Sequence, residues 1–153
     1  MKRATSLIAI SLVTIFLSGC ETTSSRPYAA STENVLKFQS ALKDSQTTVA
    51  LGEFTENAEI GTLTCRLMGP VDIAPGKTRA AYIKEAMQTE LFMAQVYDVE
   101  SELILTGRLD SLKFSSISPA SWEIGFTILS NKSEGYSVTT KYPFKTSYSA
   151  VSA

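Results

Sequence analysis

The sequence predicts an α+β fold in which one main helix covers part of a small antiparallel sheet of about four or five strands. Apolar residues alternate with polar ones in three successive segments after residue 102, and they recur at intervals of three and four over residues 78–95. One-sided alternation in consecutive segments is typical of antiparallel strands that bury one face. The expected order is two strands, the helix and three strands, arranged in two layers.

Three shorter segments precede the main helix. A helix is expected from Asn34, its N-cap, because apolar residues follow it at near-helical spacing. Segments 47–54 and 62–73 are rich in β-branched and apolar residues and are predicted as the first two strands. Pro75 and Gly76 then end the second strand and begin a turn.

The helix over 78–95 is predicted from a single apolar stripe. Glu90 interrupts this stripe, and its side chain is expected at the border of the buried face. The stripe consists of Ile83, Ala86, Met87, Leu91 and Ala94.

The three strands after the helix follow from alternation, with a hairpin turn at 132–135 between the last two. Pro143 lacks an amide hydrogen, so the final strand is expected at an edge of the sheet or bulged there. The alternating residues are Leu103, Leu105 and Leu109, then Trp122, Ile124, Phe126 and Ile128, then Tyr136, Val138, Tyr142 and Phe144.

One helix is too narrow for this sheet. Five strands at about 4.8 Å spacing span roughly 20–24 Å, whereas a helix with its side chains is about 10 Å across. The rest of the apolar face must be covered by residues 34–43, by a segment beyond Ala153, or by a partner. A C-terminal helix that is missing from the 153 residues is one expectation, and it would make the domain a truncated one.

Composition excludes several function classes. The chain has no histidine and only two cysteines, so Ser-His or Cys-His catalysis and a four-ligand structural zinc site are excluded. Fourteen basic residues against fifteen acidic ones do not provide the positive charge that nucleic-acid binding requires. We therefore expect no enzyme activity, no metal, no cofactor and no nucleic-acid partner.

The first nineteen residues have the pattern of a secretory signal. Lys2 and Arg3 precede an apolar run over 7–17, and small residues follow it. Eleven residues of helix reach roughly 16 Å, about half of a ~30 Å hydrocarbon core, so a permanent spanning helix is not expected.

The tetrapeptide Leu17-Ser18-Gly19-Cys20 resembles the lipobox of bacterial lipoproteins. The resemblance implies removal of residues 1–19, a diacylglycerol thioether on the Cys20 sulfur and an acyl chain on its amino group. Several acyl chains anchor a protein stably in a bilayer. Glu21 stands where an aspartate would favour retention at the inner membrane, so the resemblance implies the outer membrane, with the domain facing the periplasm. The alternatives are an ordinary secretory signal with an incidental cysteine, or a hydrophobic N-terminal helix.

Residues 20–33 are expected to be the lipidated cysteine and a flexible tether, because they contain many Ser and Thr residues and no large aliphatic side chain. Residues 34–153 are expected to form a single periplasmic domain. Cys65 then has no partner cysteine in the mature chain. It is either a buried thiol beside Leu63 or half of a disulfide to a cysteine outside these residues.

Two short motifs suggest catalysis but have simpler explanations. Gly76-Lys77-Thr78 lies before a helix as in a phosphate-binding loop, but Val71 occupies the position of the first glycine, so a turn and a helix cap are expected. Ser40 and Lys43 match S-x-x-K without its companion elements and are expected to be solvated.

Two further groups could form a site. The acidic residues are expected to be solvated, since no cleft or calcium-loop spacing is evident. The aromatic residues of the last strands could line a groove, but a core role is preferred. The acidic residues are Glu53, Glu56, Glu59, Asp98, Glu100 and Glu102, and the aromatic ones are Trp122, Phe126, Tyr136, Tyr142 and Phe144.

The sequence therefore favours a membrane-anchored lipoprotein without catalytic activity, an accessory or assembly factor of a cell-envelope complex. Its partners would be membrane lipid, through acylated Cys20, and an envelope protein. The expected architecture is similar to that of small periplasmic α+β envelope lipoproteins, an analogy of fold alone. The alternative is a module that binds a small molecule or lipid on its aromatic sheet face.

Overall fold

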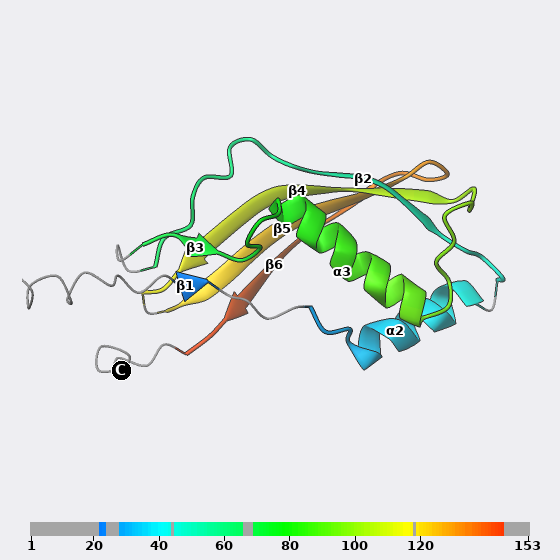
Figure 1. Cartoon of the computed structure of the whole chain (residues 1–153), viewed down its shortest axis with the longest axis horizontal. Helices are drawn as coiled ribbons and strands as arrows, with labels where there is room; N and C mark the ends of the chain where they lie inside the picture. The colour runs from blue at the N-terminus through cyan, green and yellow to red at the C-terminus, as the bar shows by residue number, and fades with distance from the viewer. Residues whose placement is uncertain (1–21, 24–27, 44, 66–68, 118, 146–153) are drawn as a thin grey trace, which may run out of the picture.

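The computed structural model describes residues 22–23, 28–43, 45–65, 69–117 and 119–145. These residues have an α+β fold with a four-stranded sheet in the order β2-β4-β5-β6 and α3 packed across it (Figure 1). The sheet strands are β2 (Ala50–Glu56), β4 (Ile104–Ser115), β5 (Ser121–Ser130) and β6 (Tyr136–Pro143), and the helical elements are α2 (Thr32–Phe38), the π-helical turn η2 (Gln39–Lys43) and α3 (Arg79–Met93).

The sheet is mixed, whereas the sequence predicted an antiparallel one. Strands β4, β5 and β6 form the expected antiparallel meander, with β6 at an edge. Strand β2 pairs with β4 in parallel, and α3 lies in the connection between them. Alternation along a strand does not report the direction of its neighbour, so this pairing could not be predicted from β2 itself.

The predicted strand over 62–73 is wrong in extent and in place. Only β3 (Val71–Asp72) is a strand, and it pairs in parallel with β1 (Thr22–Thr23) outside the main sheet. An isolated bridge between Thr64 and Pro70 folds this segment back on itself. Its apolar residues still pack on the core, because Leu63 is buried and Val71 contacts the same cluster.

Helix α3 confirms the predicted main helix. Its N-cap is Thr78, whose hydroxyl accepts a hydrogen bond from the amide of Ala81 at 3.1 Å. Ala94 caps the other end, and Gln95 follows with a positive φ of 60°, which turns the chain out of the helix. Helix α2 begins three residues earlier than predicted, with Ser31 rather than Asn34 as its N-cap.

A β-bulge at Asp110 determines which side of β4 is buried. Leu109 pairs with Phe126 and Ser111 with Gly125, so Asp110 is the extra residue between them. Leu109 and Leu112 are three positions apart and would otherwise face opposite sides of the sheet. The bulge places both in the same core cluster.

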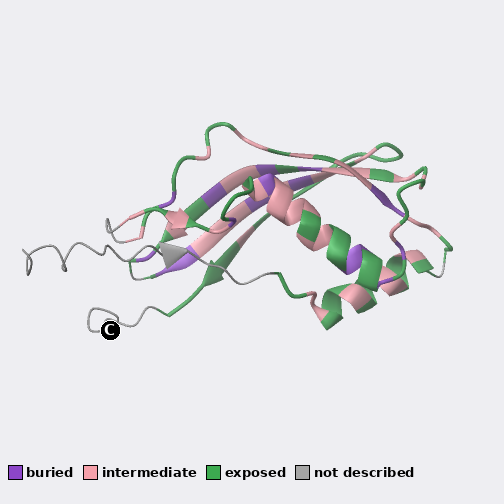
Figure 2. Ribbon diagram, in the orientation of Figure 1, coloured by how far each residue is buried: buried purple, intermediate pink, exposed green. Residues whose placement is uncertain are grey.

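Two clusters form the core between the sheet and α3. The first joins the C-terminal half of α3 to the start of β2, and the second joins the N-terminal half of α3 and residues 60–73 to the centre of the sheet (Figure 2). The buried members are Val49, Leu91, Ala94 and Val96 in the first cluster and Leu63, Leu109 and Leu112 in the second.

Gly107 allows two aromatic rings to lie over β4. A Cβ atom at this position would lie 2.6 Å from Phe54 Cε1 and 2.7 Å from Phe126 Cζ. The two rings, from β2 and β5, have centroids 6.1 Å apart. The glycine therefore provides the space in which the flanking strands contact each other.

Candidate functional site

The most exposed apolar surface of the sheet is on β6. Tyr136, Val138 and Tyr142 are 71%, 43% and 58% exposed, and we call them the β6 apolar strip. Figure 2 shows β6 exposed along its length, whereas the neighbouring strands contain buried residues.

The β6 apolar strip lies on the same face of the sheet as α3. Its residues pair across the strands with Ile128, Phe126 and Trp122, respectively. Directly opposite residues point to the same face, and Phe126 and Trp122 pack in the core cluster that contains Ile83 of α3. Strand β6 therefore extends the apolar face beyond the area that the helix covers.

The described segments outside the sheet and α3 lie away from β6. Val35, Phe38 and Leu42, from α2 and η2, pack against the C-terminal half of α3. Residues 60–73 pack over Phe114, Trp122 and Ile124. Of the three coverings expected from the sequence, the one by residues 34–43 therefore does not reach β6, because these residues pack at the C-terminal end of α3 and beside the start of β2.

The outer edge of β6 has no neighbouring strand among the described residues. Its amide and carbonyl groups along this edge can accept an added strand. Such strand addition is a common mode of protein docking. The apolar strip and the free edge lie on the same element, so one partner could contact both.

The opposite face of the sheet is polar and internally bonded. The carboxylate of Asp110 accepts hydrogen bonds from Thr127 at 2.5 Å and from Arg108 at 2.6 Å, which lower its pKa below the usual range. Lys113 pairs with Glu123 at 2.7 Å, and its hydrogen bond and charge lower the pKa of Glu123. These groups are solvated or paired, as on an ordinary water-facing sheet surface.

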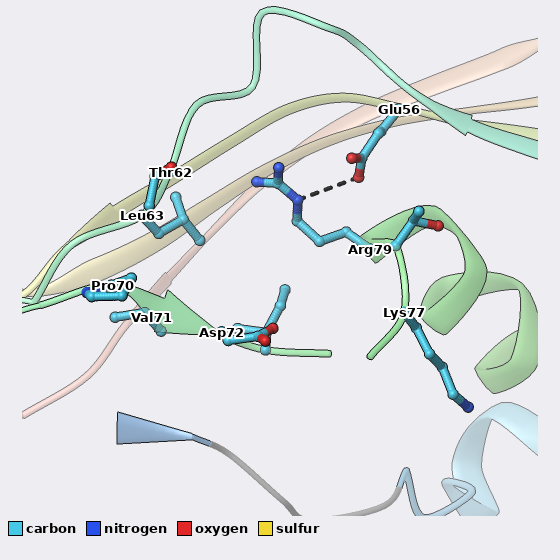
Figure 3. Close-up of a pocket in the computed structure, with 10 residues that line it drawn as sticks. Glu56, Thr62, Leu63, Pro70, Val71, Asp72, Lys77 and Arg79 are labelled. Atoms are coloured by element: carbon cyan, nitrogen blue, oxygen red, sulfur yellow. Dashed lines mark ion pairs between the residues drawn. The ribbon is translucent and has the colours of Figure 1, made fainter. Parts of the chain in front are cut away.

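A hollow of about 360 Å³ lies between β3, residues 62–63 and the start of α3 (Figure 3). Arg79 reaches across it, with Nε 3.3 Å from Glu56 Oε2. Its other guanidinium nitrogens donate to the carbonyls of Gly61 at 3.1 Å and Ile60 at 3.3 Å. Arg79 therefore holds residues 60 and 61 to the start of α3 through these contacts.

Glu90 is buried, which corrects its predicted place at the border of the helix stripe. Glu90 is only 3% exposed. Glu90 Oε1 accepts hydrogen bonds from the hydroxyl of Tyr28, from the Ser31 amide at 2.9 Å and from Asn34 Nδ2 at 3.2 Å. Residues 28–34 are thereby fixed on α3, although 28–33 had been expected to belong to a flexible tether.

These contacts change the titration of both partners. Burial alone would raise the pKa of Glu90, but the hydrogen bonds from Tyr28, Ser31 and Asn34 outweigh it and leave the pKa below its ordinary value. Burial, together with the hydrogen bond and charge of Glu90, raises the pKa of Tyr28 to about 12. A charged residue inside an apolar helical stripe was the sequence signal for this contact, but its partners could not be identified from spacing.

The residues predicted for lipidation and signal cleavage lie outside the described residues. They are Leu17, Ser18, Gly19, Cys20 and Glu21. Cys65 is half-buried and its thiol is not part of a disulfide among the described residues. Its backbone amide donates a hydrogen bond to the carbonyl of Gly69 at 3.0 Å. Leu63 is buried, but Cys65 is more exposed than the expected buried thiol.

The two motifs that suggested catalysis have structural roles. Thr78 caps α3, and Lys77 pairs with Glu85. Ser40 donates to the carbonyl of Lys37, and Lys43 donates to Gln95, so the Ser and Lys of S-x-x-K do not contact each other.

The acidic and aromatic groups are dispersed. Among the described residues, no three His, Cys, Asp or Glu side chains are placed to hold a metal ion. Trp122 and Phe126 are half-buried in the core, whereas Tyr136 and Tyr142 are exposed. The hollow beside Arg79 is lined by none of the sheet aromatics, and a second of about 480 Å³ beside Gln46 is likewise lined by none of them.

No helix in the described part of the chain is long and apolar enough to cross a membrane. No protein-family model matches the chain, and no curated protein or solved structure shows significant similarity to it.

Proposed function

We propose that the protein is a lipoprotein of the cell envelope, held by acylated Cys20 with its domain in the periplasm, and that it docks a partner protein without catalysing a reaction. The single observation that supports docking is the β6 apolar strip beside a free strand edge. Exposed apolar surface on a strand edge is unfavourable in water and is typical of an interaction site. The lipobox residues Leu17 to Cys20 support the anchor.

The additional helix expected from the sequence is part of this proposal. A helix from a partner, or from a segment outside these residues, would lie beside α3 over the β6 apolar strip and complete a helical layer. The strip contains tyrosines, which can contact a partner with an apolar ring while keeping a polar hydroxyl in water. An open strip of this kind is better suited to a protein surface than to a small molecule, which binds best in an enclosed cavity.

The anchor is tested by metabolic labelling with palmitate. The wild-type chain should incorporate label and remain with the membranes, and Cys20→Ala should do neither. Cys65→Ala is the matched control, since it removes the other cysteine and should label normally. Labelling of Cys20→Ala would contradict the proposal.

The docking surface is tested by a photo-crosslinking amino acid placed at Tyr136 or Tyr142 in cells. Thr139 is the matched control, because it is exposed on the same strand but faces the opposite side of the sheet. We expect a discrete cross-linked protein from positions 136 and 142 and several-fold less from position 139. Equal yields from all three positions, or none, would exclude docking on this strip.

A further inference from the structure

One end of the molecule is tied to the position of the lipid anchor. Strand β1 pairs in parallel with β3, with Thr22 opposite Val71. Cys20 precedes Thr22 by two residues, so covalent geometry keeps their Cα atoms within about 7 Å of each other. Given the acylation of Cys20 in the proposed function, the bilayer must lie close to β3.

The same end carries exposed apolar side chains. The end of β4, the start of β5 and the end of β6 meet there, because Ser115 pairs with Ser121 and Ser121 with Pro143 (Figure 1). Ile117, in the turn between β4 and β5, is 69% exposed, and Phe144 is 37% exposed. We call this end, with Ile117, Phe144 and β3, the anchor end.

Charge distinguishes the two ends of the sheet. Lys113, Lys141 and Lys145 lie at the anchor end, where the nearby acids are Glu123 and Asp72. The opposite end is acidic. Its basic residues are Lys37, Lys43 and Lys132, of which Lys37 is paired with Glu33 and Lys132 with Glu102. The acidic residues there are Glu33, Asp98, Glu100, Glu102 and Glu134.

From these observations we infer that the anchor end of the domain lies directly on the bilayer surface, with Ile117 inserted at the level of the headgroups and Lys141 and Lys145 over anionic lipid. Burial of an apolar side chain in the interface contributes to membrane binding in proportion to the apolar area removed from water. Lysines near anionic lipid add electrostatic attraction within about a Debye length. The β6 apolar strip then extends away from the membrane, where a periplasmic partner can reach it.

The test uses the lipidated chain in vesicles of phosphatidylethanolamine and phosphatidylglycerol. A nitroxide label is placed by Ile117→Cys or, as a control, by Val99→Cys, in a Cys65→Ala background. The control residue lies at the acidic end and is 68% exposed, close to the 69% of Ile117. At position 117 we expect several-fold lower accessibility to a water-soluble nickel chelate and higher accessibility to oxygen than at position 99. Equal chelate accessibility at the two positions would overturn the inference.

Failure of the anchor is distinguishable from failure of the orientation. An unlipidated Cys20, seen by mass spectrometry of the N-terminal peptide, would overturn the proposed function and this inference with it. Lipidated, vesicle-bound protein with a water-exposed label at 117 would overturn the orientation alone. Protection at 117 that disappears on dilution of protein in lipid would indicate contact with a second copy and would also overturn it.

Three further variants test what holds the anchor end on the bilayer. An insertion of about ten Gly and Ser residues between Glu21 and Thr22 adds a coil of roughly 17 Å and should expose the label at 117. The same insertion between Arg26 and Pro27 follows β1 and should leave it protected. Lys141→Glu with Lys145→Glu should weaken protection mainly in vesicles that contain phosphatidylglycerol. Identical behaviour of the two insertions would contradict the role of β1.

Discussion

The same face of the sheet is covered in one half and open in the other. Beneath α3, Leu109 on β4 is 1% exposed, whereas Tyr136 and Tyr142 on β6 are 71% and 58% exposed. Both halves have the same alternating sequence pattern. Alternation therefore reports that a strand has an apolar side, and the elements packed on that side decide whether it becomes core or a docking surface.

The difference has a geometric origin. Helix α3 packs against β2 and β4, and a helix about 10 Å wide spans about two strands at 4.8 Å spacing. Helix α2 packs on α3 and leaves β6 open. Substitutions in the covered half, in the open half and on the water-facing side measure this difference.

The largest effect is expected from truncation in the covered half. Leu109→Ala should lower the free energy of unfolding by about 2–5 kcal/mol, because it opens a cavity in the core. Val138→Ala, on the open half, should lower it by less than about 1 kcal/mol. Urea unfolding followed by circular dichroism measures both, and equal losses would mean that β6 is covered in solution.

Gly107 tests how tightly the covered half is packed. Gly107→Ala places a methyl group within 2.7 Å of the Phe54 and Phe126 rings, and we expect a loss of about 1–3 kcal/mol. Gly61→Ala is the control, since no atom lies within 4 Å of its added methyl group. A neutral Gly107→Ala would show that the two rings can separate without loss of stability.

Glu90 tests whether residues 28–34 belong to the covered half. Glu90→Ala removes the acceptor for Tyr28, Ser31 and Asn34, and should cost about 1–3 kcal/mol. Hydrogen–deuterium exchange should rise in residues 28–38 and stay unchanged on β6. Glu85→Ala, at an exposed site on the same helix, is the control and should leave that exchange unchanged.

The pH dependence of this contact has a defined sign. The pKa of Glu90 is lowered on folding, so its stabilisation is present above the ordinary carboxyl pKa of 4.5 and is lost as the pH falls through the folded value. The pKa of Tyr28 is raised from 10.0 to about 12, so its contribution is complete below pH 10.0 and is lost towards pH 12. Protection factors of residues 28–38, which correct the exchange rate for its intrinsic pH dependence, should fall at both extremes, and the fall in acid should be absent in Glu90→Gln.

The smallest effect is expected on the water-facing side. Glu123→Gln removes the pair with Lys113, whose side chain is 71% exposed, and should change stability by less than about 1 kcal/mol. Thermal unfolding at low and high salt measures it. A larger loss would show that this face is shielded from water.

Local patterns predicted the elements whose signals are complete within one segment. Helix α3 has both a Thr78 cap and an apolar stripe, and β5 and β6 alternate over most of their length, so each was found near its observed bounds. The predicted alternation of β4 ends at Leu109, because the bulge at Asp110 interrupts it, and the strand continues to Ser115. The segment 62–73 alternates equally well, but it has no place in the main sheet and packs as a loop. The proposed lipid anchor at Cys20 depends on the sequence motif from Leu17 to Cys20 alone.

By itself the sequence determined the α+β class, the main helix, the meander and an apolar face wider than one helix, because each depends on periodicity or size. Tertiary structure decided the parallel pairing of β2, the bulge that turns Leu112 inward, the burial of Glu90 and the choice of β6 as the open strand. These features depend on which segments meet across long stretches of chain. A carboxylate in a helix stripe is buried only where distant donors such as Tyr28 and Ser31 reach it, and no local pattern specifies that meeting.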